Sequence, residues 1–173
     1  MNRKRNLAWH FTGPKLRDGS PLPKPGKWLT FSGPLVMCES GLHASRQPSD
    51  ALRYAPGNTL HLVEVGGKII EGSDKLVCSR RKIIVSMDAE PLLRYYARMQ
   101  ALSVLHLWDA PNEVLDWLMC GDEETRAAAW AAAGDAAWGA AWAAAGAAAG
   151  DAAWAAAGDD FNALVFDAFE DYL

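Results

Sequence analysis

The feature that most constrains the fold is an alanine-rich tract near the end of the chain. Between residues 127 and 157, 21 of the 31 residues are alanine, and tryptophan or glycine recurs at every fourth position from 130 to 158. Because a helix turns about 100° per residue, a four-residue step drifts roughly 40° past a full turn. The tryptophan and glycine stripe would therefore spiral around one continuous helix.

Gly-Asp pairs at residues 134–135, 150–151 and 158–159 suggest an alternative to that single helix. Each pair places a C-terminal glycine before an aspartate that can cap the next helix, so we favour breaks at some of these sites. A continuous helix stays open, since each interior glycine costs only about 1 kcal/mol relative to alanine. The tryptophans of the tract are too many to leave exposed, so we expect them to pack on the body or on a second copy, giving a homo-oligomer through the alanine-rich helices.

Charge is divided unevenly along the chain. Residues 1–82 contain 14 Lys and Arg against 6 Asp and Glu, whereas residues 83–173 contain 3 against 15. The basic half would attract an anionic ligand, and the acidic half disfavours nucleic acid and anionic membranes as partners. Asp135 and Asp151 interrupt the alanine tract, so we expect no membrane span.

The three cysteines lie far apart, without the paired spacing of a zinc site or a disulfide framework. The chain also lacks a phosphate loop, a Gly-x-Gly-x-x-Gly turn, a His-Glu-x-x-His zinc motif and a nucleophile elbow. We expect a metal-free cytoplasmic protein without a cofactor, in the host cytoplasm if the gene is a phage gene.

The sequence pattern indicates strands in the first half of the chain and helices in the second. Short β-rich runs bounded by glycine and proline predict strands at 7–11, 35–38, 59–65, 68–71, 75–78 and 81–87. A turn-rich loop covers 14–34, a short helix covers 47–54, and helical spacing begins at Glu90. We predict an α+β fold: a small, mostly antiparallel sheet domain followed by an Ala/Trp-rich, all-helical C-terminal half. The expected divisions are a β-rich ligand-binding domain at 1–88, connecting helices at 89–121, and a helical region at 122–173 ending in an amphipathic helix.

Residues 38–45 carry a Cys-x-x-Gly-Leu-His-Ala sequence. Together with the alanine-rich tail, it resembles a family of uncharacterised small phage and bacterial proteins, over residues 7–88. A phage origin would imply a role in evading host defence.

Three further segments are distantly similar to the NAD-binding core of ADP-ribosyltransferases. These are Trp9-His10-Phe11-Thr12, Ala51-Leu52-Arg53-Tyr54 and Val63-Glu64-Val65-Gly66-Gly67, which together with Gly41-Leu42-His43-Ala44-Ser45 follow the order of that core. The resemblance implies that His10 grips a ribose. His43 stands where that family has a stacking tyrosine, and no later strand clearly presents the catalytic glutamate.

The candidate ligand-binding residues combine imidazoles, hydroxyls and guanidinium groups, which hold phosphate and sugar oxygens. They are His10, His43, Ser45, Arg46, Arg53, Tyr54, Arg80 and Arg81. Each also has a structural explanation, as a core histidine, a solvated helix face or, for residues 80–82, a solvated hairpin end.

The favoured function is a binding protein that sequesters a small anionic nucleotide, either ADP-ribose-like or a cyclic nucleotide immune signal. Holding a ligand requires donors and a concave site, without a tuned acid or base. Two alternatives remain open: an ADP-ribosyltransferase-like enzyme acting on NAD, and a protein-interaction module whose functional surface is the alanine-rich tract. Catalysis is therefore left open, with binding favoured and no catalytic residue assigned.

Overall fold

The structure is a computed structural model that describes residues 5–107, 109–129, 131 and 151–173. Its elements, in chain order, are β1 Leu7–Thr12, β2 Trp28–Thr30, β3 Leu42–Ala44, α1 Pro48–Leu52, β4 Thr59–Glu71, β5 Leu76–Asp88, α2 Glu90–Ser103, η1 Leu105–Leu107, α3 Asn112–Cys120, α5 Asp151–Ala168 and η2 Glu170–Tyr172. They form two compact units. The strand unit comprises residues 1–90 and 161–173, and the helical unit comprises residues 91–160.

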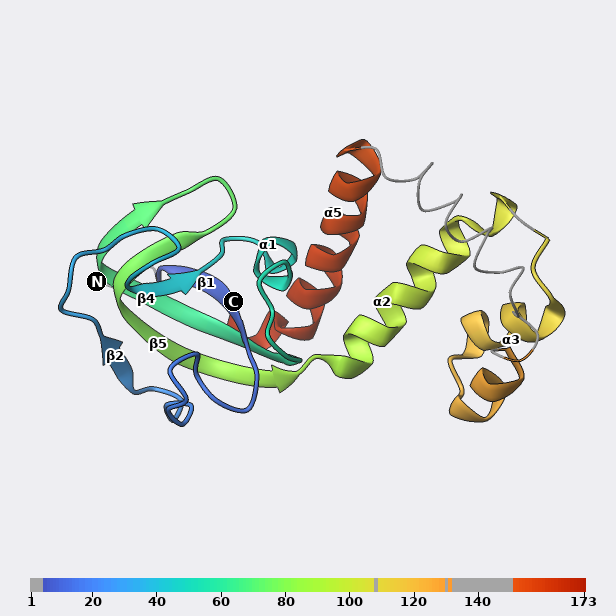
Figure 1. Cartoon of the computed structure of the whole chain (residues 1–173), viewed down its shortest axis with the longest axis horizontal. Helices are drawn as coiled ribbons and strands as arrows, with labels where there is room; N and C mark the ends of the chain where they lie inside the picture. Colours follow the sequence, from blue (N-terminus) through green and yellow to red (C-terminus); the bar gives the residue numbers. More distant parts are fainter. Residues whose placement is uncertain (1–4, 108, 130, 132–150) are drawn as a thin grey trace. The chain divides into compact units, whose positions relative to one another are not determined.

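The strand unit is built on a long, bent hairpin of β4 and β5 (Figure 1). All pairings are antiparallel in the order β1-β4-β5-β2, and β3 also pairs with β5. The register of β4 against β5 shifts at Leu62/Val63 and at Gly66/Ile69, and such bulges bend and twist a strand. Ser45, just after β3, pairs with Trp9 of β1. This bridge links β3, which lies beside β5 off the main strand order, to β1, so that β1, β4, β5 and β3 enclose a small barrel.

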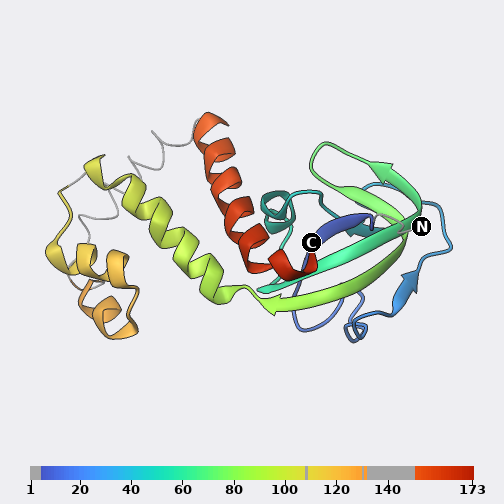
Figure 2. The ribbon, with the colours of Figure 1, turned by 180° about the vertical axis from the view of Figure 1, so that it is seen from behind.

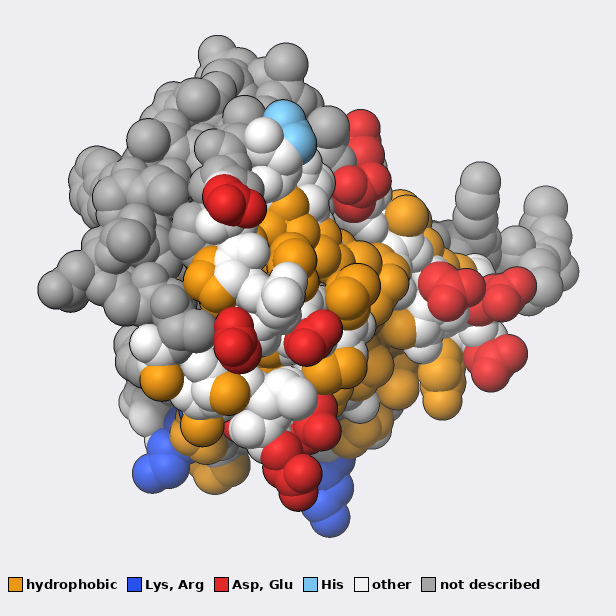
Figure 3. All heavy atoms as spheres, turned by 90° about the vertical axis from the view of Figure 1, so that its right-hand side faces the viewer, with side chains coloured by type: hydrophobic (Ala, Val, Ile, Leu, Met, Phe, Trp, Pro, Cys, Tyr) orange, Lys and Arg blue, Asp and Glu red, His pale blue; other side chains and the backbone are white. Residues whose placement is uncertain are grey.

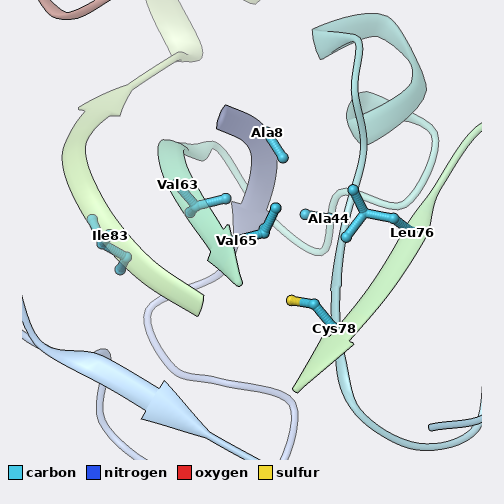
Figure 4. Close-up of a cluster of buried hydrophobic side chains, with 7 residues drawn as sticks. All are labelled: Ala8, Ala44, Val63, Val65, Leu76, Cys78 and Ile83. Atoms are coloured by element: carbon cyan, nitrogen blue, oxygen red, sulfur yellow. The ribbon is translucent and has the colours of Figure 1, made fainter. Parts of the chain in front are cut away.

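Strand alternation divides the barrel residues between an inner and an outer face. The inner face carries seven buried side chains from β1, β3, β4 and β5, gathered between the strands in Figure 4: Ala8, Ala44, Val63, Val65, Leu76, Cys78 and Ile83. The small and β-branched members suit this narrow interior, where larger side chains would force the strands apart. These seven side chains are therefore surrounded by protein.

The outer face of β1 is covered by the end of the chain. Trp9 lies between two rings of that segment, with centroid distances of 5.9 Å to Phe166 and 5.0 Å to Phe169. The Asn162 side-chain oxygen accepts a 2.8 Å hydrogen bond from the Ser49 backbone N–H at the start of α1. The C-terminal turns of α5 lie beside β1 in both views (Figure 1 and Figure 2). The last helix thus docks on the strand domain, as its amphipathic sequence predicts.

The helical unit has a small core of its own. Val114, Leu118 and Ala129 are buried together, and residues 123–129 are helical. The unit is acidic, with 3 Lys and Arg against 10 Asp and Glu in residues 91–160. Figure 3 shows carboxylates scattered among apolar side chains on this side of the molecule.

The α+β class and the antiparallel sheet are confirmed, but several strand boundaries differ from those predicted. Residues 68–71 and 81–87 belong to the two long strands, so the hairpin end expected at 80–82 lies at 72–75 instead. The strand predicted at 35–38 is wrong. That segment is a turn closed by a Val36–Ser40 bridge, with Cys38 at φ +68°, and the strand follows at β3. β2 lies inside the predicted loop at 14–34.

Gly158–Asp159, one of the three sites at which breaks were considered, has no break, since α5 is continuous from Asp151 to Ala168. The buried side chains of Phe161, Val165 and Phe169 anchor the following turns. Their burial outweighs the roughly 1 kcal/mol that an interior glycine costs. The Gly-Asp pair at 134–135 and the tryptophans at 130, 138 and 142 lie outside the described residues, as does Gly150 of the pair at 150–151.

Candidate functional site

A row of polar residues crosses the inner face of the barrel beyond the apolar cluster. His10 of β1 pairs in register with His61 of β4, and His61 pairs with Ser86 of β5. The rings of His10 and His61 are stacked, with centroids 6.3 Å apart. Ser86 is exposed and His10 half-buried, so the two ends of the row meet solvent, whereas His61 between them is only 1% exposed.

Both ring nitrogens of His61 have hydroxyl partners. Nε2 lies 2.8 Å from Thr12 Oγ1, and Nδ1 lies 2.7 Å from Ser86 Oγ. Burial, and after it the charge of Arg81, lowers the pKa of His61 to about 4. His61 is therefore neutral near pH 7, and a hydroxyl can serve either nitrogen as donor or as acceptor.

Arg81 is the buried cation of this site. It pairs in register with Val65 on the inner face of β5, is 6% exposed, and donates a hydrogen bond from Nη1 to the carbonyl oxygen of His43. Within the described ranges no carboxylate pairs with it, unlike Lys82, whose Nζ lies 2.7 Å from Glu64. Burial lowers the pKa of Arg81 to about 10, which is the expected sign of an uncompensated buried charge.

The Arg81 charge acts on all three histidines of the unit. The pKa of His10 lies well below its usual value, because of burial first and then Arg81, with smaller effects from the other two histidines. The pKa of His43 is also lowered, by burial and then Arg81. His43 Nε2 accepts a 3.0 Å hydrogen bond from the Cys38 backbone N–H, so its own proton is on Nδ1. We call Arg81, His10, His61, Thr12 and Ser86 the Arg81 cluster.

The Ser86–His61 contact has the spacing of a nucleophile and its base, but its surroundings oppose that chemistry. In a serine hydrolase a carboxylate stabilises the imidazolium that forms when the base takes the proton. Here Thr12 stands in the carboxylate position, and the charge of Arg81 destabilises an imidazolium at His61. A cation without a counter-ion, beside neutral donors and hydroxyls, is suited to receiving an anion.

The sequence-predicted residues fall into three groups. His10 and Arg81 lie in the cluster, and His43 contributes its carbonyl oxygen to Arg81. Ser45 is buried in the seam between β1 and β3. Arg46 reinforces that edge, donating to the Leu7 carbonyl oxygen at 2.8 Å and pairing with a carboxylate of β4.

The remaining three predicted residues lie away from the cluster. Tyr54 is half exposed, donates to an Asp74 carboxylate oxygen, and has Lys75 4.0 Å above its ring. Arg53 is exposed on the same turn. Arg80 points from β5 to the opposite face, where its guanidinium lies 4.6 Å over the Trp28 ring. A role for these three in ligand binding stays a prediction.

Sequence reasoning missed His61, Thr12 and Ser86 as site residues. The signal was available for His61, which follows the alternation of Val63 and Val65 along β4 and is therefore inward. Thr12 and Ser86 required the register of β1 and β5 against β4, which the sequence does not supply.

The described part of the chain offers neither a metal-ligand group nor a membrane-spanning helix. No group of three or more His, Cys, Asp and Glu residues there is placed to hold a metal ion. None of the described helices combines the length and apolar character needed to cross a membrane.

Comparisons with known proteins give one match. No curated protein and no solved structure matches the chain. Residues 7–95, just over half the chain, match a family described as Domain of unknown function (DUF7666). The match spans all five strands and the whole Arg81 cluster, and the protein therefore belongs to the DUF7666 domain family.

Proposed function

We propose that the strand unit binds a small, phosphate-bearing anion of nucleotide type at the Arg81 cluster and holds it without cleaving it. The observation that carries this proposal is the buried guanidinium of Arg81, which has no carboxylate partner among the described residues. An unpaired buried charge is costly, and a bound anion would supply the missing counter-charge.

The neighbours of Arg81 support a phosphate group as that anion. His10 and Ser86 bring a nitrogen and a hydroxyl to the two solvent-facing ends of the row. Arginine binds phosphate oxygens through parallel hydrogen bonds, and its remaining N–H groups can make them while Nη1 stays on His43. Two other basic residues of the strands already have carboxylate partners, Arg46 with Glu71 and Lys82 with Glu64.

Binding is favoured over NAD cleavage because an acid in the right place is missing. Cleavage of the nicotinamide bond in the transferases depends on a glutamate, and the two acids on β4 here are both paired, Glu64 with Lys82 and Glu71 with Arg46. The chain continues after β5 as α2, so among the described residues no later strand brings an acid to the cluster.

The proposal is tested by calorimetry with AMP, ADP-ribose, NAD and 3′,5′-cyclic AMP on the full chain. Arg81→Met should abolish binding, and Arg80→Met, the adjacent arginine on the opposite face, should leave it unchanged. At a ligand concentration 100 times Kd, the wild type should gain about 2.7 kcal/mol of stability. Equal binding by wild type and Arg81→Met, or no binding of any of the four, overturns the proposal.

The fate of the ligand separates the binder from the enzyme. We expect NAD or AMP recovered after denaturation of the complex to be chemically unchanged. Release of nicotinamide at a rate that depends on His10 would instead favour the transferase. The counter-defence role and oligomerisation through the alanine-rich helices stay predictions.

A further inference from the structure

We infer that the strand unit carries a docking face for an amphipathic helix, and that this face accepts residues 161–173 of a second copy of the chain. In the structure the same residues of the chain itself, called here the C-terminal segment, cover the face. The inference is independent of the proposed function, because it concerns the outer side of β1 and not the inner row of polar residues.

The docking face consists of large apolar side chains on the outside of β1 and β4. Strand alternation places Trp9 and Phe11 on the side of β1 opposite the core residue Ala8. In register they pair with Leu62 and Leu60 of β4. We call these four residues the Trp9 face, and each is at most 3% exposed. Uncovered, they would form an apolar patch of a kind that monomeric proteins rarely expose.

The cover of the Trp9 face comes from outside the family domain. The DUF7666 match spans residues 7–95 and contains the whole face, whereas residues 96–160 separate the match from the C-terminal segment. The matched domain therefore depends on a segment outside it to complete this cover. A second copy of the chain carries an identical segment.

The C-terminal segment presents one buried stripe to the strand unit. At about 100° per residue, its buried positions fall within an arc of roughly 100°. Asp167 lies outside that arc and is exposed. The ring of Phe169 meets the Trp9 ring edge-on, with an interplanar angle of 88°. The buried residues, in the pattern Phe-Asn-x-x-Val-x-x-x-Phe, are Phe161, Asn162, Val165 and Phe169.

Asn162 makes the docking specific. Its side-chain oxygen accepts the 2.8 Å hydrogen bond from the partly buried Ser49 backbone N–H. The N-cap residue of α1, Gln47, makes no side-chain capping hydrogen bond, so Asn162 supplies an acceptor that the start of α1 needs. A helix without a polar acceptor at this position would leave that N–H unpaired, which is costly.

Charge favours a second copy as the occupant. Residues 161–173 contain three Asp and Glu and no Lys or Arg, whereas residues 1–90 contain 14 Lys and Arg against 8 Asp and Glu. An acidic segment is therefore attracted to the basic part of another chain.

Exchange between copies keeps every contact of the docked segment, because face and segment are identical in each chain. Exchange of an identical element is a low-cost route to a dimer. The attached segment competes at an effective concentration on the order of 1 mM. Exchanged dimers should therefore appear as the protein approaches that concentration.

The first test is sedimentation equilibrium of the wild-type full chain up to about 1 mM. We expect a monomer–dimer equilibrium that an excess of a synthetic peptide of residues 157–173 shifts back to monomer. The peptide with Asn162→Ala should be about tenfold less effective, because it lacks the acceptor for Ser49. The peptide with Asp167→Asn, changed at an exposed position, should match the wild-type peptide.

The second test measures the Trp9 face in a single chain. Full-chain Asn162→Ala keeps the face and the apolar contacts of the segment, but its own segment docks less well. The labelled wild-type peptide should bind this variant about tenfold more tightly than it binds the wild-type chain. Full-chain Asp167→Asn is the matched control and should bind the peptide as weakly as the wild type.

The outcomes are distinct. A chain that stays monomeric at about 1 mM contradicts exchange between copies. A dimer that excess peptide leaves intact also overturns it, and would place the dimer contact elsewhere, as in the alanine-rich helices. Equal binding of the peptide by Asn162→Ala and the wild type overturns the docking face itself.

Discussion

The buried His61 makes the stability of the strand unit depend on pH. Its pKa is about 4 in the folded chain against an ordinary value of 6.5. Above pH 6.5 both folded and unfolded states carry a neutral ring. As the pH falls from 6.5 towards 4, the unfolded chain binds a proton that the folded chain refuses, so stability is lost over this window.

The expected size of the effect follows from that gap. Each pKa unit corresponds to about 1.4 kcal/mol, so the full loss from His61 approaches about 3 kcal/mol near pH 4. Linkage gives a loss of about 2 kcal/mol between pH 7.5 and pH 5. His10, whose pKa is lowered in the same direction, adds to this loss in the wild type.

The assay is urea unfolding at pH 7.5 and pH 5, followed by backbone amide NMR signals of β4 and β5 so that the strand unit alone is reported. His61→Gln should lose about 2 kcal/mol less than the wild type on acidification. Arg81→Met should also lose less, since the charge of Arg81 is the second cause of the low pKa. An acid-induced loss that is the same in wild type and His61→Gln would refute this reasoning.

Three substitutions test the packing around the site, each measured as the free energy of unfolding in urea. Arg81→Met should fold and change stability by no more than about 1 kcal/mol, because it removes a buried charge that lacks a partner; a loss of several kcal/mol would contradict the unpaired charge. Gly41→Ala should cost about 2 kcal/mol or more, since Gly41 has φ +114° and an added Cβ would collide with Val77. An unchanged urea unfolding midpoint for Gly41→Ala would contradict the close contact between Gly41 and Val77. Phe169→Ala should cost about 3 kcal/mol by emptying the space beside Trp9, and a loss below about 1 kcal/mol would mean that the C-terminal helix does not hold the barrel.

The sequence predicted the fold class and the identity of the strongest elements. β-forming residues between glycine-rich turns locate β4, and Pro56-Gly57 marks the end of the short helix expected at 47–54. The continuity of β4 and β5 was not predictable in the same way. The glycines at 66–67 and the charged residues at 80–82 are typical of turns. In the structure, β-bulges and cross-strand pairing keep both strands continuous through these positions.

The candidate site was predicted in part, for a physical reason. Histidine and arginine are recognisable as candidate ligand-binding residues without knowledge of their neighbours. His10 and Arg81 could therefore be proposed from the sequence. His61, Thr12 and Ser86 gain their significance from the register between three strands, and Arg81 from the absence of a nearby carboxylate among the described residues. Arg80 and Arg81 are adjacent in sequence, yet only the structure separates the arginine over Trp28 from the arginine in the interior.

A crystal structure of the full chain grown with AMP tests the anion site most directly. The account predicts the terminal phosphate within hydrogen-bonding distance of the Arg81 guanidinium and the His10 ring. A phosphate bound instead over Trp28 and Arg80, with Arg81 still bonded only to the carbonyl oxygen of His43, would contradict it.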